Sequence, residues 1–574
     1  MTHTLETEKK ISRRALLGTA GLGAAAAAVA SPVAAPGSMG GEMKKYHPIT
    51  ASASKNVVET DSGKVYGYAR DGVIGYRGIP YGASTEGAGR FMPPAKPKPW
   101  TGVRSALYWS WASPCAINAT IDGRRANWAH DDESFMFEWD DGTPSEDCLR
   151  LNVWTPALDN NKRAVLLFMH GGGMVFGGSD ELRAYDGENM ARMNDVVMVT
   201  LNHRLGVLGF LNLMEYGDQY AASPNVSMLD LILALKWVRT NIASFGGDPG
   251  RVMIFGQSGG GSKVGTIMGM PDAKGLFHRA SIQSGSGLRQ STVEGSAKLA
   301  HATLAELGIT RDNIAKLHTD FTFEQIVEAG MVGQKNAVAG MAVSPVPGSG
   351  LNWGPVVDGK LIPRNTWDPA APDESAGVPL MVGTVLNEAY NTVQMGNASL
   401  EDVDVAGAKK LLMPLMGAHT DHVFEVTQKL HPAATPFEVF SRSAAMRNRI
   451  NAYRQAELKA RQGAAPAYLY RFEWQSPMCD GRGRAFHTSE LPHCFHNAAL
   501  CAKLTGNTPD AHQLADKVAG AWAAFAKTGN PNHPGIPKWE AYNDRVPTMS
   551  FNSECVAADD PDGELRKAVL EAIA

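Results

Sequence analysis

The sequence predicts an α/β protein with a large, mostly parallel central sheet flanked by helices. Residues 163–169 and 196–201 are apolar runs apart from Arg163 and Thr200, which suits strands covered on both faces. A helix is predicted over 228–245, where four apolar residues recur at helical spacing: Leu231, Leu235, Val238 and Ile242. Strands that alternate with helices indicate parallel pairing with right-handed crossovers.

The composition limits the class of protein, the number of domains and the kinds of partner. The chain has 574 residues, 44% hydrophobic and 20% charged, which is ample for a core. We expect one catalytic domain over 56–574 rather than several small domains. The net charge of -4 leaves no basic stripe, so nothing indicates a nucleic-acid partner.

The N-terminal 30 residues have the pattern of a bacterial twin-arginine export signal. Arg13 and Arg14 precede an Ala/Gly-rich run that ends in a small-residue cleavage motif at 28–30. A membrane anchor would need about 20 strongly apolar residues, and this run is shorter and mostly alanine. We therefore expect an exported protein, periplasmic or secreted and not inserted in a membrane, with a disordered lead-in over 31–55.

A small N-terminal antiparallel sheet is expected next. Residues 57–60 and 64–68 flank a turn at 61–63 and predict a hairpin, which the stretch 73–81 would continue.

The stretch 252–261 predicts a nucleophile elbow. A β-prone apolar run leads into Gly256-Gln257-Ser258-Gly259-Gly260, and the residues that follow can open a helix. On such a turn the serine sits in strained backbone, and Gly256 and Gly260 leave room for strand and helix to cross. Chance alone would give the bare pattern in roughly one chain in three of this composition, so its context matters.

Three glycines directly after the strand 163–169 suggest an oxyanion hole. The segment His170-Gly171-Gly172-Gly173 has no side chains to block a carbonyl oxygen from backbone N–H groups. Each such donor is worth on the order of 3 kcal/mol of barrier, and the N–H of Gly259 would add a further one. The alternative is a merely flexible turn.

A serine nucleophile needs a base and an orienting acid, in the chain order Ser, Asp/Glu, His. Among 16 histidines, His487 stands out because it follows the predicted strand 468–472 and a glycine-rich loop. For the acid, the residues themselves leave Asp358, Glu388 and Asp404 open.

Many ordered blocks between Asn56 and Asn552 make the chain resemble the type-B carboxylesterases, the family of bacterial para-nitrobenzyl esterases and cholinesterases. The blocks are 76–81, 90–94, 145–153, 170–173, 202–206, 242–249, 256–260, 283–286, 355–359 and 525–532. The resemblance implies the α/β-hydrolase fold and a serine hydrolase that cleaves carboxylic esters of small molecules through an acyl-enzyme, without metal or organic cofactor.

The same resemblance implies the roles of individual residues. Ser258 would be the nucleophile, Glu388 the triad acid and His487 the base. The oxyanion donors map onto Gly172, Gly173 and Gly259. Three neighbours of the base are expected to stand outside the chemistry, Glu490 as a structural residue and His493 and His496 as bystanders.

Three other functions stay open. A non-catalytic, cholinesterase-like interaction module would share the blocks, but such modules commonly lose the nucleophile. A lipase would show activation on emulsified long-chain substrate. An amide or carbamate hydrolase would follow the same acylation path with a poorer leaving group. The oligomeric state is not predicted.

The six cysteines allow disulfides in an exported protein. The resemblance implies a bond between Cys115 and Cys148, which would stabilise the fold by about 3 kcal/mol. The pairing of Cys479, Cys494, Cys501 and Cys555 cannot be predicted.

Two residues beside the nucleophile depart from the family pattern. Gln257 stands where relatives usually have Glu, which removes a carboxylate and argues against choline esters. Gly259 replaces the usual Ala and is expected to widen the floor of the cleft slightly.

Two apolar features invite a substrate-binding interpretation. The loop 116–147 combines aromatic and acidic residues, Trp128, Phe135, Phe137 and Trp139 among them, and is either a lid or a solvated loop with rings tucked into the body. Four methionines either line an adaptable pocket or fill the core: Met268, Met270, Met331 and Met341.

Overall fold

A computed structural model describes residues 48–115, 120–121, 124–125, 131–140, 142–339 and 351–573. The export signal, most of the lead-in, Trp128 and Met341 lie outside the described residues.

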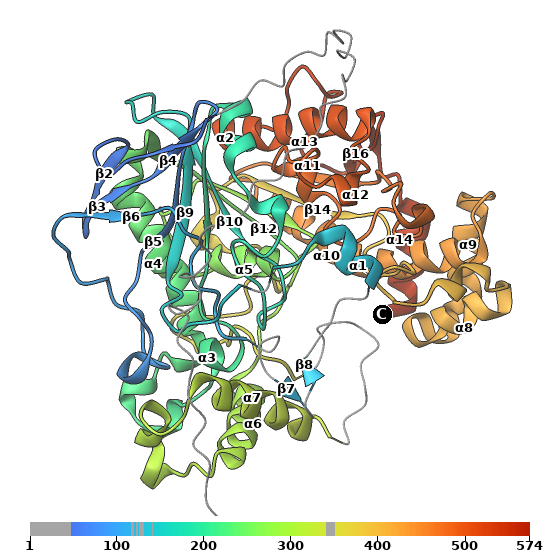
Figure 1. The fold of residues 1–574 in the computed structure, drawn as a ribbon. Coiled ribbons are helices and arrows are strands. Elements are labelled where there is room, and N and C mark those ends of the chain that lie inside the picture. Colours follow the sequence, from blue (N-terminus) through green and yellow to red (C-terminus); the bar gives the residue numbers. More distant parts are fainter. Residues whose placement is uncertain are drawn as a thin grey trace, which may run out of the picture. The chain divides into compact units, whose positions relative to one another are not determined.

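A twelve-stranded sheet runs through the described structure (Figure 1). Its strands, in spatial order, are β1 (Thr50–Ala51), β4 (Tyr68–Arg70), β5 (Val73–Pro80), β9 (Arg150–Thr155), β11 (Val197–Leu201), β10 (Arg163–Met169), β12 (Gly247–Gln257), β13 (Arg279–Gln283), β14 (Leu380–Val385), β15 (Ala467–Phe472), β16 (Pro547–Phe551) and β17 (Val556–Asp559). The strands from β11 to β16 pair in parallel, and the flanking strands pair antiparallel. The predicted fold class is therefore confirmed.

The N-terminal region differs in two details from the prediction. β2 (Val57–Thr60) and β3 (Gly63–Tyr66) form the expected hairpin, but β5 belongs to the large sheet and does not continue it. The third strand of the small sheet is instead β6 (Val103–Ser105), which pairs with β3 in parallel. Part of the predicted disordered lead-in is also ordered, because β1 pairs with β4. These pairings join residues far apart in the sequence, which local patterns do not reveal.

The described helices include some on each face of the sheet and others that pack mainly on other helices. They are α1 (Asp131–Phe137), α2 (Glu188–Asn194), α3 (Gly206–Phe210), α4 (Val226–Asn241), α5 (Gly259–Ile267), α6 (Val293–Glu306), α7 (Phe323–Ala337), α8 (Val405–Met416), α9 (Thr420–Leu430), α10 (Pro436–Gln462), α11 (Leu491–Cys494), α12 (Ala502–Thr505), α13 (Pro509–Thr528) and α14 (Gly563–Ile573). In Figure 1, α6 and α7 lie side by side, and α8 and α9 form a second pair at the periphery. The predicted helix over 228–245 is α4 followed by a short 3-10 turn.

Alternate residues of β10 enter two separate cores. Val165, Leu167 and Met169 pack in the core that also contains the apolar stripe of α4. Leu166 and Phe168 pack in the opposite core with α13. Because side chains alternate across a strand, an uninterrupted apolar run is what a doubly covered strand requires.

The carboxyl ends of five central strands meet at one edge of the sheet. Register places Met169 beside Gly256, Gln257 beside Gln283, Gln283 beside Gly383, and Gly383 beside Tyr470. The segments that follow β10, β12, β14 and β15 therefore start from the same edge, where open α/β sheets bind ligands. These segments carry His170, Ser258, Glu388 and His487.

Candidate active site

Ser258 forms the turn between β12 and α5, as predicted. Its backbone has φ 57° and ψ -124°, a sparsely populated conformation for a residue with a side chain. The Ser258 N–H donates to Gln283 O at 2.7 Å, and its carbonyl accepts from Ser262 N–H at 3.1 Å. These two bonds hold the strained turn between the neighbouring strand and the helix.

Two glycines allow β12, α5 and the end of β10 to come into direct backbone contact. A Cβ on Gly260 would lie 1.9 Å from Met169 O, and a Cβ on Gly256 would lie 2.5 Å from the carbonyl carbon of Gly260. Both distances are far inside van der Waals contact, so a larger residue at either position would force the strand and the helix apart. The predicted reason for these glycines is confirmed.

The glycine loop after β10 lies directly against the elbow. Gly172 and Gly173 have φ of 77° and 61°, a region that favours glycine. Within the described residues, the N–H groups of Gly172, Gly173 and Gly259 have no hydrogen-bond acceptor. The three predicted donors are thus available to a ligand oxygen.

The expectation that Gly259 widens the cleft is wrong. A Cβ on Gly259 would lie 2.1 Å from Gly173 O, so the glycine loop fills the space that an alanine methyl group would take. Glycine at this position brings the two halves of the donor set closer together.

Glu388 and His487 meet through a direct hydrogen bond. Glu388 Oε2 lies 2.5 Å from His487 Nδ1, and the His487 N–H donates to Glu388 O at 3.1 Å. The other two acids that the sequence left open are occupied elsewhere: Asp358 binds Asn225, and Asp404 caps the N-terminus of α8. Of the three acids, Glu388 is the one that contacts the histidine.

The pKa of His487 is raised above its ordinary value. Burial lowers the pKa, but the charge and hydrogen bond of Glu388, with smaller contributions from Glu490 and Glu133, outweigh that effect. The carboxylate therefore stabilises the imidazolium, which is the form that a base adopts after taking a proton.

On its other side, the imidazole contacts Gln257, the residue next to Ser258. His487 Nε2 lies 3.2 Å from Gln257 Nε2, while Ser258 Oγ makes no hydrogen bond to His487 in the described structure. An amide nitrogen can only donate, so His487 Nε2 accepts and the ring proton sits on Nδ1, facing Glu388. A base and its nucleophile often come into full contact only when substrate binds.

Gln394 hydrogen-bonds the loop that carries His487. The sequence did not lead us to predict this residue. Its Oε1 accepts from His487 N–H at 3.2 Å, and its Nε2 donates to Glu133 Oε1 at 3.0 Å. Glu133 belongs to α1, so a single amide links the loop 116–147 to the base. The polar residues Asn391, Thr392 and Gln394, shortly after Glu388, were the signal that could have pointed to it.

The other residues near the base occupy buried or peripheral positions. Glu490 is buried, and burial raises its pKa to about 7. His493 is buried against Phe472 and Trp474. His496 lies 2.7 Å from Asp516. None of the three hydrogen-bonds Ser258, Glu388 or His487 in the described structure.

The predicted disulfide is not formed: Cys115 and Cys148 are not bonded to each other. Cys148 belongs to the main core, and burial raises the pKa of its thiol to about 12. Cys115 packs instead in a small separate cluster with Leu205 and Phe176. The two side chains therefore face different apolar surroundings, which the spacing in the sequence does not reveal.

The described part of the aromatic loop packs mainly into the body. Phe137 is buried against Phe486, with ring centroids 5.5 Å apart, and contacts Trp139 at 4.8 Å. Phe135 is exposed. Tucked rings outnumber exposed ones here, in line with the second interpretation of this loop.

An apolar cavity of about 400 Å3 lies beside the glycine loop. Its wall comes from Val175 just after the loop, the start of α3, α7 with Met331, the segment Pro114–Cys115 and Trp353, and it does not include Ser258, Glu388 or His487. Met331 therefore lines a pocket, whereas Met268 and Met270 are fully buried in the core. A cavity of this size suits a small organic group.

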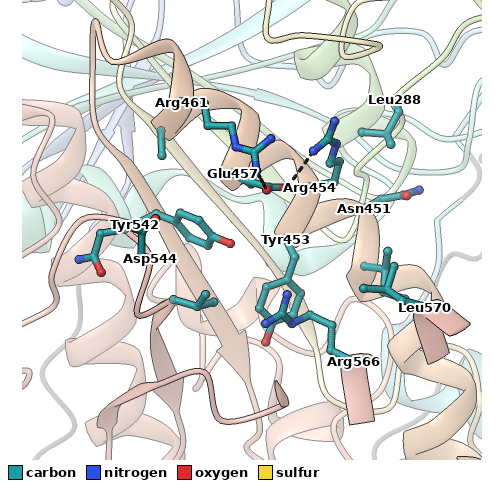
Figure 2. A pocket seen from close by; sticks show the side chains of 14 residues that line it. Leu288, Asn451, Tyr453, Arg454, Glu457, Arg461, Tyr542, Asp544, Arg566 and Leu570 are labelled. Carbon is teal, nitrogen blue, oxygen red and sulfur yellow. Dashed lines mark hydrogen bonds and ion pairs between the residues drawn. The ribbon is translucent and has the colours of Figure 1, made fainter. Parts of the chain in front are cut away.

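A larger cavity of about 670 Å3 lies elsewhere, along α10 (Figure 2). Figure 2 shows Arg454 and Arg461 both bound to Glu457, with Arg566 beside Tyr453. None of the residues predicted for the site lines this cavity.

Comparisons with known proteins identify the family of the chain. A model of the carboxylesterase family matches residues 54–561. A para-nitrobenzyl esterase of Bacillus subtilis is 33% identical over 90% of this chain and 98% of its own length. A phenmedipham hydrolase of Pseudarthrobacter oxydans is 30% identical over 86% of this chain and 94% of its own length.

A solved structure supports the same fold. An esterase from Clostridium hathewayi, described as able to hydrolyse aliphatic aromatic polyesters, superposes with a TM-score of 0.77 and 32% identity, over 92% of this chain and 100% of that one. The chain therefore belongs to the carboxylesterase family and is a carboxylic ester hydrolase with the α/β-hydrolase fold.

Proposed function

We propose that Ser258, Glu388 and His487 form the catalytic triad, with the N–H groups of Gly172, Gly173 and Gly259 as the oxyanion hole. The observation that carries this proposal is the bond between Glu388 and His487, whose other ring nitrogen reaches the residue beside Ser258. The oxyanion hole is supported by the N–H groups of Gly172 and Gly173, which have no hydrogen-bond acceptor within the described residues.

In the acylation step, His487 Nε2 takes the proton of Ser258 Oγ as the oxygen attacks the ester carbonyl. The carbonyl oxygen becomes negative and is stabilised by the three N–H groups. His487 then returns the proton to the leaving alcohol, which leaves an acyl-enzyme.

Water repeats the sequence in deacylation. His487 removes a proton from the water, the second oxyanion forms in the same place, and Ser258 regains its proton as the acid departs. Glu388 stays ionised throughout and stabilises the imidazolium. The raised pKa of His487 is consistent with that role.

The cavity beside the glycine loop supports a substrate with a small apolar acyl or alcohol group. Gln257 places a neutral amide where a carboxylate would attract a cation, which argues against choline esters. Because one relative is a phenmedipham hydrolase, phenmedipham belongs in the substrate panel as a second candidate.

The decisive experiment compares Ser258→Ala with Ser262→Ala. Ser262 lies one helical turn away on α5, and its hydroxyl donates to Gly285 O at 2.9 Å. We expect hydrolysis of p-nitrophenyl acetate and butyrate to vanish in Ser258→Ala, with an unchanged circular dichroism spectrum, and to persist in Ser262→Ala. Full turnover in Ser258→Ala would remove the assignment.

We also propose that residues 1–30 direct export through a twin-arginine route, supported by Arg13-Arg14 and the small-residue motif that follows. Replacing both arginines by lysine should retain the protein in the cytoplasmic fraction. Among the helices of the described residues, none is long and apolar enough to cross a bilayer.

A further inference from the structure

Lys263 is a buried lysine on the nucleophile helix, five residues after Ser258. Its side chain is 0% exposed, and its Nζ donates to His170 O at 3.0 Å. Side chains on a helix lean toward its N-terminus, so Lys263 lies along the face of α5 that carries Gly259 and Gly260. That face touches the end of β10, where a Cβ on Gly260 would lie 2.8 Å from the same carbonyl of His170.

Lys263 has no ion pair that would offset the burial of its charge: within the described residues, no carboxylate lies within 4.0 Å of its Nζ. Glu181 is the acid that acts on it from further away, and burial lowers the pKa of Lys263 to about 7. Burial and Lys263 together lower the pKa of His170 and His203, whose rings stack 5.0 Å apart.

Burying an ammonium costs free energy, and an apolar residue of similar volume is often as stable or more stable. The hydrogen bond to His170 O is the specific contact that Lys263 makes and an apolar residue would lose. His170 is the residue from which the glycine loop leaves β10, two residues before Gly172.

We propose that Lys263 is a positioning residue: its bond to the His170 carbonyl locks the glycine loop onto the nucleophile helix and so fixes the N–H groups of the loop relative to Ser258. This inference rests on the proposed roles of Ser258 and the oxyanion donors. It gives a role to a charged side chain at a fully buried position.

Lys459 offers a matched control. It is also 0% exposed and donates to backbone carbonyls, those of Ser375 at 2.9 Å and Ala376 at 2.6 Å. It lies near the end of α10 and contacts no residue of the proposed site. Lys459→Met should lower the melting temperature and leave kcat unchanged.

Lys263→Met keeps the length of the side chain and removes the donor. We expect kcat for p-nitrophenyl butyrate to fall about 10- to 100-fold, below the loss seen when an oxyanion donor itself is removed, with KM within about 2-fold. The inhibition constant of an alkyl trifluoromethyl ketone, whose adduct with serine carries the oxyanion, should rise by a similar factor. The melting temperature should fall less than in Lys459→Met.

Other outcomes separate the inference from the proposed function. A kcat of Lys263→Met within threefold of the wild type, while Ser258→Ala is inactive, overturns only the role of Lys263. If Lys263→Met does not fold, Lys263→Gln decides, because its shorter amide should still show a lower kcat with unchanged KM. If neither variant folds, Lys263 is structural and the inference is wrong.

Discussion

The two halves of the proposed site are built by different means. Ser258 and the glycine loop are positioned by backbone-to-backbone contact, with Gly260 against Met169 O and Gly259 against Gly173 O. Glu388 and His487 are positioned by side-chain hydrogen bonds, to each other and to Gln394. The first half depends on close backbone contacts that glycine permits, with one side-chain bond from Lys263 to His170 O, and the second half depends on polar side chains from distant loops.

This difference predicts how each half fails. Loss of a glycine in the first half should disrupt structure and activity together. Loss of a polar partner in the second half should impair the chemistry and leave the fold in place.

The largest effect is expected for Gly260→Ala. Its added methyl carbon would lie 1.9 Å from Met169 O, so strand and helix must separate. We expect a loss of at least about 3 kcal/mol of unfolding free energy, measured by urea denaturation, and no detectable esterase activity. Gly377→Ala is the control, because nothing lies within 4 Å of its added carbon. Equal stability of the two variants would contradict the close contact.

Glu388→Gln should come next, with kcat about 1,000- to 10,000-fold lower and the melting temperature little changed. His487 must be neutral to act, so activity falls as pH drops below its pKa. Because Glu388 raises that pKa, the variant should keep its residual activity to lower pH than the wild type. A pH profile of kcat/KM measures the shift.

Asp404→Ala serves as the control for Glu388. It removes the N-terminal cap of α8, at a cost of about 1 kcal/mol, and should leave kcat unchanged. Loss of activity in Asp404→Ala with retention in Glu388→Gln would transfer the acid role to Asp404.

The smallest effect is expected for Gln257→Glu, which places a carboxylate beside His487 Nε2. The added charge should raise the pKa of His487 further, so the acid limb of the pH profile moves to higher pH and activity recovers above it. The ratio of kcat/KM for butyrylthiocholine to that for p-nitrophenyl butyrate should rise. An unchanged ratio would show that residue 257 does not contact the alcohol group of the substrate.

Much of the fold could be predicted from the sequence because its determinants are local. An apolar run such as 163–169 matches a strand covered on both faces, and β10 has these bounds. The elbow was also predictable, since the motif itself joins the strand and the helix whose crossing requires Gly256, whereas the contact of Gly260 with Met169 O comes from a distant strand.

The tertiary structure decided everything that depends on long-range pairing. It brought Glu388, rather than Asp358 or Asp404, into contact with His487, placed β6 rather than β5 beside the hairpin, and put Cys115 and Cys148 in separate clusters. It also placed Gln257 and Gln394 in contact with His487, and Lys263 in contact with the carbonyl of His170. Local sequence determines backbone conformation and which face of an element is apolar, whereas a hydrogen bond between distant segments exists only once the sheet has set their register.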